Sequence, residues 1–180
     1  QTSFGATAAS TAAAVRARLA SFAESDYIDR FGHAIVAAQA PWLDFTSSYT
    51  ERFCSLIGEA AKQLFDFKKE IQFSLCARIA IFIGLPEPRP GLPDDIGDLC
   101  TKQLLTMISN RGTIKRVETY PLGHAAGFVA LQEALQELSQ DRADVCLVGG
   151  VDSYLHPQTL QWIEDCGQLH SENLSWGFIP

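Results

Sequence analysis

Apolar residues along this chain recur with two different spacings, and each spacing indicates one kind of element. In several stretches they return every three or four residues, as along one face of a helix; Phe53, Ile57 and Leu64 belong to one such series. Elsewhere they form a short unbroken run, such as 77–84, which is typical of a strand buried on both faces. In chain order these patterns predict helices at 7–22 and 49–67, a strand at 77–84, a helix at 94–110, a strand at 113–119, a helix at 125–138, a strand at 145–148 and a helix beginning at Pro157.

Two of the predicted helices carry an apolar stripe that we expect to face the core. The stripe of the first helix consists of Val15, Leu19 and Phe22. The stripe of the helix at 125–138 consists of Phe128, Leu131, Leu135 and Leu138. Between the first two helices, residues 32–41 are predicted to form a loop.

The order of these elements indicates the fold class. Apolar strands separated by helices predict an α/β fold, in which a mostly parallel sheet is covered by helices on both faces. The strand at 113–119 is more polar than the other two, so we expect it at an edge of the sheet.

Composition and charge argue against several classes of function. The 180 residues are 47% hydrophobic and 19% charged, which is an ordinary balance for a folded domain. The net charge of −7, without any basic stripe, argues against nucleic acid and against an anionic membrane surface as partners. No apolar run approaches the roughly 20 residues that cross a bilayer.

The cysteines and histidines give no sign of a disulfide scaffold or a metal. The five cysteines are odd in number and none has a C-x-x-C spacing, and the four histidines are scattered. No glycine-rich phosphate-binding pattern occurs. We therefore expect a reduced, cytoplasmic protein with neither a metal nor another cofactor.

The strongest candidate for chemistry is the connection between the strand at 113–119 and the helix that follows it. Small residues surround this turn, among them Gly123 and Ala125, and they leave room for a ligand beside the first amides of the helix. His124 lies at the turn itself. It can act as an acid, a base or a hydrogen-bond donor to a carbonyl group, or it can be a structural residue that fills the turn.

A second candidate follows the strand at 145–148. Asp152 and Ser153 come just after its C-terminal end, which is where α/β folds place ligands. The same two residues can also cap the turn, and the sequence leaves both roles open.

The segment Ala143–Ser153, which reads ADVCLVGGVDS, resembles the β-ketoacyl synthases, which are condensing enzymes of the thiolase-like superfamily. The turn at His124 and its small neighbours, the closing residues Trp176–Pro180 and the opening turn Thr2–Gly5 also resemble this family. The resemblance implies a thiolase-like layered half-domain that spans residues 1–180. It also implies a longer protein, in which a first strand precedes Gln1 and a last strand follows Pro180.

The same resemblance implies the function and the partners. In the family a nucleophilic cysteine occupies the position of His124, and here no cysteine lies nearby. The resemblance assigns His124 to the catalytic position and Gly123, Ala125 and Asp152 to acyl binding. The expected partners are thioesters of acyl-carrier protein or coenzyme A, in fatty acid or polyketide metabolism, and a second copy of the protein.

The missing cysteine leaves three functions open. The protein is a condensing acyltransferase in which His124 replaces the cysteine, or a degenerate relative that binds acyl chains without a covalent step. Alternatively, it is a non-catalytic scaffold, or a partner subunit of an active synthase comparable to a chain-length factor. The catalytic histidines of the family belong to the second half of its fold, so this chain alone does not decide among the three.

Overall fold

The computed structural model describes residues 2–5, 7–66, 77–108, 112–172 and 174–180. These residues form two compact units. The first unit combines stretches within 1–52, 89–92 and 153–180, and the second combines stretches within 53–88 and 93–152. Cys76 and the last two residues of the helix predicted at 94–110 lie outside the described residues.

The second unit contains a parallel sheet of three strands. They are β3 (Arg78–Leu85), β4 (Thr113–Pro121) and β5 (Val145–Gly150), in the order β4-β3-β5. Both neighbours of β3 run parallel to it, which confirms the predicted sheet and the edge position of the polar strand. β3 is buried along nearly its whole length because helices cover both of its faces.

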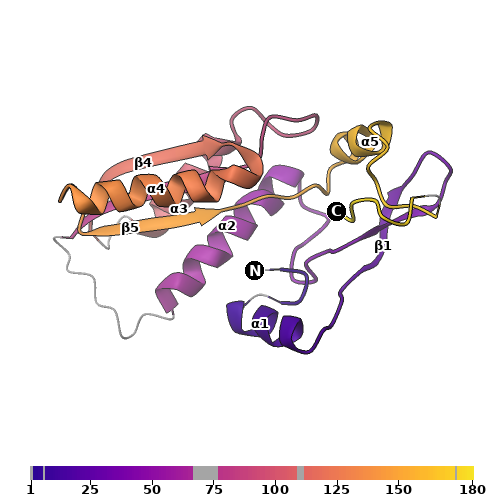
Figure 1. Ribbon diagram of the computed structural model, residues 1–180, viewed down its shortest axis with the longest axis horizontal. Coiled ribbons are helices and arrows are strands. Elements are labelled where there is room, and N and C mark those ends of the chain that lie inside the picture. The colour runs from indigo at the N-terminus through magenta and orange to yellow at the C-terminus, as the bar shows by residue number, and fades with distance from the viewer. Residues whose placement is uncertain (1, 6, 67–76, 109–111, 173) are drawn as a thin grey trace. The chain divides into compact units, whose positions relative to one another are not determined.

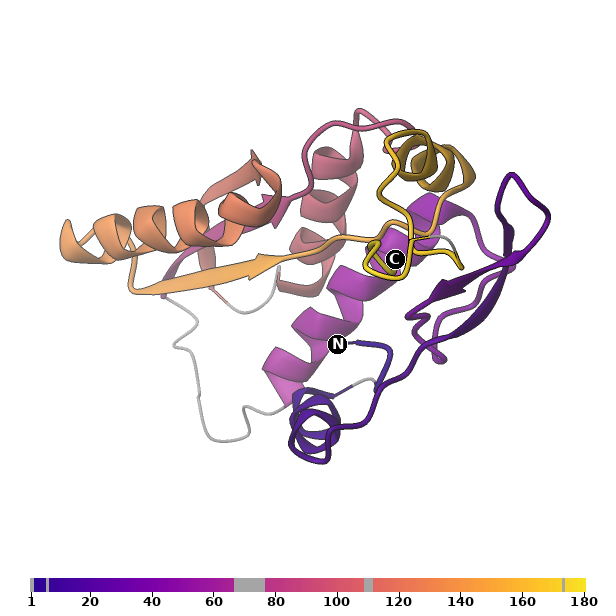
Figure 2. The same cartoon turned by 45° about the vertical axis from the view of Figure 1, so that its right-hand side comes forward.

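Helices lie on the two faces of this sheet, as Figures 1 and 2 show. On one face, α4 (Ala126–Ser139) packs on Ala80 and Phe82 of β3. On the other face lie α3 (Ile96–Ile108) and the part of α2 (Tyr49–Asp66) that begins at Phe53. Successive side chains of β3 point to opposite faces of the sheet, so they pack into two separate cores.

The face that α4 turns to the sheet is not the predicted one. Its buried residues are Ala126, Ala130, Ala134 and Glu137. The predicted stripe is exposed instead, with Phe128 at 79% and Leu135 at 59%. Small alanine side chains let the helix approach the large ring of Phe82, which a row of leucines would hold farther away.

The sheet has no gap beside β3. β5 pairs directly with β3, from Ile79 opposite Val145 to Gly84 opposite Gly150. The expected first strand before Gln1 and last strand after Pro180 stay a prediction.

The first unit contains an antiparallel hairpin that the sequence pattern did not predict. Strands β1 (Ala23–Ile28) and β2 (Ala34–Ala37) form it, and β2 lies within the predicted loop. The hairpin shares a small core with α5 (Pro157–Asp165), in which Ile35 packs with Leu160 and Ile163. His156 accepts the amide N–H of Gln158 at 3.3 Å and so caps α5.

The first helix of this unit is shorter than predicted. It is α1 (Ala8–Arg16), and its N-terminus is closed by a capping box between Thr7 and Ser10. The predicted stripe of Val15, Leu19 and Phe22 is exposed, so it is not a core face. Over the described stretches of the chain, no helix combines the length and the hydrophobicity that crossing a bilayer requires.

Candidate functional site

A hollow of about 290 Å³ lies in the second unit, where the strands end and α4 begins. β4 runs into one turn of 3₁₀ helix, η1 (Gly123–Ala125), which continues directly into α4. The hollow is lined by Gly84, Leu85, Pro86, Gly123, His124, Ala126, Gly127, Gly150, Val151 and Asp152. Residues from β3, β4, β5 and α4 or their ends thus meet at the carboxyl edge of the sheet, where α/β folds bind ligands.

Three glycines make this close meeting possible. A Cβ at Gly84 would lie 3.0 Å from the Cβ of Ala126, so strand and helix touch there through backbone and methyl groups. A Cβ at Gly150 would lie 3.2 Å from the carbonyl oxygen of Gly84. Gly123 has a φ of +54°, in the left-handed region that favours glycine, and this turns the chain sharply before His124.

His124 lies on the turn with an exposed side chain that lines the hollow. The described residues provide no hydrogen-bond partner for its imidazole. No hydrogen bond among the described residues therefore fixes the imidazole in a structural role, and the expectation that it meets a ligand stays a prediction. Among the described residues, no carboxylate forms an ion pair or a hydrogen bond with the ring that would activate it as a base.

The other predicted site residues divide into two groups. Gly123 and Asp152 line the hollow with His124, and Asp152 is exposed at the end of β5. Ala125 does not line it; this residue is the N-cap of α4. Ser153 has the turn-capping role, since its hydroxyl accepts the amide N–H of Leu155 at 3.4 Å.

The N-terminus of α4 adds a positive electrostatic contribution to the hollow. Its N-cap is an alanine, so no side chain at that position accepts the first amide N–H groups. The carbonyl oxygen of Gly123 accepts the amide N–H of Ala126, so the first amide is held within the turn. The dipole of α4 still favours a partially negative atom beside its N-terminus.

No cysteine among the described residues lines the hollow. Cys146 belongs to β5 but lies at the α4 face, where its thiol contacts the carbonyl oxygen of Ala134 at 3.5 Å. Burial raises the pKa of the Cys146 thiol and, in α3, raises that of Cys100 to about 12. Both are poor nucleophiles at neutral pH. The described residues also hold no cluster of histidine, cysteine and acidic side chains fit for a metal.

Sequence reasoning missed the third wall of the hollow, which is formed by Gly84, Leu85 and Pro86. These residues lie at the end of the apolar run 77–84, about forty positions before His124 in the sequence. No local sequence pattern therefore links them to the turn. A signal was nevertheless present, since Gly84 ends a buried strand at the edge where ligands bind.

The described residues form an α/β fold with a hollow at a strand–turn–helix connection. Residues 123–176 match the family model described as Beta-ketoacyl synthase, N-terminal domain. The match begins at the turn before His124 and contains α4, β5 and α5. This part of the chain is therefore similar to a β-ketoacyl synthase N-terminal domain, and the sheet and helices are consistent with part of a thiolase-like half-domain. A search of curated proteins returns no significant match.

Proposed function

We propose that this protein binds acyl thioesters of acyl-carrier protein or coenzyme A in the hollow beside His124, without forming an acyl-cysteine. The observation that carries the proposal is the position of His124, exposed at the turn into α4 and lining the hollow. By resemblance this is the place of the nucleophile in condensing enzymes. The matched family makes acyl thioesters the ligand class to test first.

The proposed binding mode uses two kinds of donor. The thioester carbonyl oxygen accepts a hydrogen bond from the imidazole N–H of His124, and it lies near the positive end of the α4 dipole. Gly84 and Gly123 line the same hollow. The exposed carboxylate of Asp152 borders the polar side of the same hollow.

Binding is favoured over covalent catalysis for two reasons. No described cysteine lines the hollow, and His124 has no hydrogen-bonded base among the described side chains. Histidine can carry an acyl group, but an acyl-imidazole hydrolyses readily and is a poor store for an acyl chain. A degenerate synthase that binds without acyl transfer is therefore our first choice, and a scaffold or partner subunit of an active synthase is the alternative.

The proposal places the protein in the cytoplasm and in fatty acid or polyketide metabolism. The four described cysteines are free thiols, as is usual where thiols stay reduced. A homodimer or a heterodimer with a synthase is part of the same proposal, by resemblance to the family.

Two measurements on the same samples test this function. The protein is incubated with acetyl-coenzyme A, hexanoyl-coenzyme A and acylated carrier protein, and is then analysed by intact-mass spectrometry and by titration calorimetry. We expect saturable binding and no mass increase, with affinity reduced about tenfold in His124→Ala, which corresponds to one lost hydrogen bond. The control is His33→Ala, which removes an exposed histidine of the other unit.

Other outcomes would change the conclusion. A mass increase by one acyl group that disappears in His124→Ala would establish covalent catalysis at His124. Complete absence of thioester binding would reject the hollow as a thioester site and favour the scaffold or partner-subunit role.

A further inference from the structure

The carboxylate of Glu87 lies beside the turn that carries His124. A Cβ at Gly123 would lie 3.1 Å from the Cγ atom of Glu87 and 3.1 Å from its Oε1 atom, so the acidic group is next to the backbone of Gly123. Gly123 lines the hollow, and so does Pro86, the residue before Glu87. The carboxylate is therefore placed at the edge of the hollow, one residue away from His124.

Two features of the chain hold the carboxylate in this position. Pro86 and Pro88 stand on either side of Glu87, and proline restricts both its own backbone and that of the residue before it. The dipole of α4, which follows the turn, favours a negative charge near its start. Glu87 is exposed, and among the described residues no side chain forms an ion pair with it, so its charge is available to a ligand.

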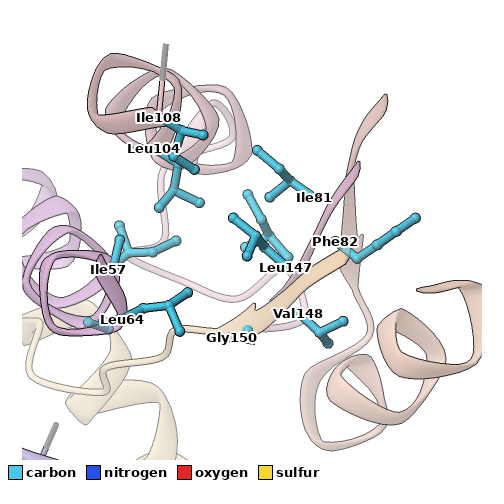
Figure 3. A pocket seen from close by; sticks show the side chains of 13 residues that line it. Ile57, Leu64, Ile81, Phe82, Leu104, Ile108, Leu147, Val148 and Gly150 are labelled. Atoms are coloured by element: carbon cyan, nitrogen blue, oxygen red, sulfur yellow. The ribbon is translucent and has the colours of Figure 1, made fainter. Parts of the chain in front are cut away.

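The residues that line the hollow include no lysine or arginine that would balance a second negative charge. Their polar side chains are the imidazole of His124 and one further carboxylate, that of Asp152. The apolar cavity between β3, β5, α2 and α3, on the other face of the sheet, provides no cation either, because the side chains that line it are all apolar (Figure 3). A ligand carboxylate beside His124 would therefore meet Glu87 without a basic side chain among the lining residues.

On the basis of the proposed function, we infer that Glu87 determines the substrate class of the hollow, by selecting thioesters of uncharged acyl groups over those whose acyl group carries a carboxylate. In a malonyl group only one carbon separates the carboxylate from the thioester carbonyl, so a carbonyl held beside His124 brings the carboxylate close to Glu87. Two like charges about 6 Å apart in water weaken binding about threefold, and about tenfold at half the dielectric constant of water.

The test compares two thioesters of similar shape and different charge on the full 180-residue chain. Isovaleryl-coenzyme A ends in two methyl groups where malonyl-coenzyme A has two carboxylate oxygens, and the coenzyme part is the same in both. Affinities are measured by titration calorimetry at pH 8 and low ionic strength, with competition against isovaleryl-coenzyme A where malonyl binding is weak. A carboxylate also costs more to desolvate than an isopropyl group, so the readout is the change of the affinity ratio in a variant.

Glu87→Gln is the decisive variant, because it removes the charge and keeps the size of the side chain. We expect the ratio of isovaleryl to malonyl affinity to fall about three- to tenfold. Added salt should lower the ratio in the wild type and change it little in Glu87→Gln, since salt screens exposed charges. The matched control is Glu59→Gln, which removes an exposed carboxylate of α2 that pairs with Lys62 at 3.6 Å, and it should keep the wild-type ratio.

The possible outcomes separate this inference from the proposed function. If isovaleryl-coenzyme A binds and Glu87→Gln keeps the wild-type ratio, the inference is wrong and the proposed function stands. An equal fall of the ratio in Glu59→Gln would also overturn the inference, because the effect would then come from the net charge of the chain. If neither thioester binds to the wild type, both are wrong.

Discussion

Replacing Gly84 with alanine should push α4 away from the sheet and distort the hollow. The new Cβ would lie 3.0 Å from the Cβ of Ala126, 3.2 Å from its carbonyl carbon and 3.2 Å from the amide nitrogen of Gly127. Ordinary contacts of this kind begin at 3.4 Å. Two of the three atoms are backbone, so no side-chain rotation relieves the contact, and the start of the helix must move by a few tenths of an ångström.

The expected cost follows from this crowding. An extra methyl group in a closely packed contact destabilises a protein by about 1–3 kcal/mol. With a urea m-value of about 2 kcal/mol per molar, the midpoint of unfolding should fall by about 0.5–1.5 M. Urea unfolding followed by circular dichroism measures this, and calorimetry with hexanoyl-coenzyme A should show weaker binding because the α4 amides have moved.

Gly127→Ala is the matched control in the same hollow. A Cβ there would have no heavy atom within 4 Å, and alanine is favoured over glycine in a helix by about 0.5–1 kcal/mol. This variant should therefore be more stable than the wild type. Adding Ala126→Gly to Gly84→Ala removes the nearest contact and should restore part of the lost stability.

The reasoning is refuted if Gly84→Ala unfolds at the wild-type urea concentration and binds hexanoyl-coenzyme A with wild-type affinity. That result would mean that strand and helix do not approach as closely as the structure places them. A loss of stability of equal size in Gly127→Ala would refute it as well, since that residue has open space around it.

Two further predictions concern an ion pair and two thiols. The guanidinium and the amide N–H of Arg78 lower the pKa of Asp144 from 3.8 to about 2. The ionised carboxylate therefore stabilises the fold above about pH 4, and this stabilisation is lost as the pH falls toward 2. Urea midpoints of wild type and Asp144→Asn should therefore differ at pH 5 and converge toward pH 2, and a constant difference would contradict this. Burial raises the pKa of Cys100 to about 12, so iodoacetamide at pH 8 should label the exposed Cys166 and leave Cys100 unlabelled. Peptide mass spectrometry measures the labelling of each cysteine. Equal labelling of the two would contradict the prediction and show that the core beside α3 opens.

The sequence predicted the elements of the second unit well because their signals are local. An unbroken apolar run indicated β3, and the small residues around His124 indicated the turn into α4. His124 and Asp152 were expected at a ligand site, and both line the hollow. The carboxyl ends of parallel strands lie at the same edge of the sheet. The proximity of His124 and Asp152 therefore followed from the order and direction of the strands alone.

Other features depended on contacts between distant segments and could not be predicted in this way. The leucine stripe of α4 has the stronger helical pattern, yet Ala130 and Ala134 face the sheet, because the space beside Phe82 admits only small side chains. The hairpin of β1 and β2 was missed because its strands are short, irregular in register and without regular alternation. The wall of the hollow at Gly84 was missed because, like the alanine face of α4, it depends on a contact between segments that are distant in the sequence.

The pairing of β3 with both neighbours also sets an order of assembly. Ile79 pairs with Ile114, 35 residues later, and with Val145, 66 residues later. Closing the longer loop costs about 0.6 kcal/mol more chain entropy, since its length is nearly double. During synthesis β3 and β4 can pair while β5 is still being made. Gly150 therefore reaches its place last, and in the nascent chain the hollow beside His124 is incomplete until the third strand has docked.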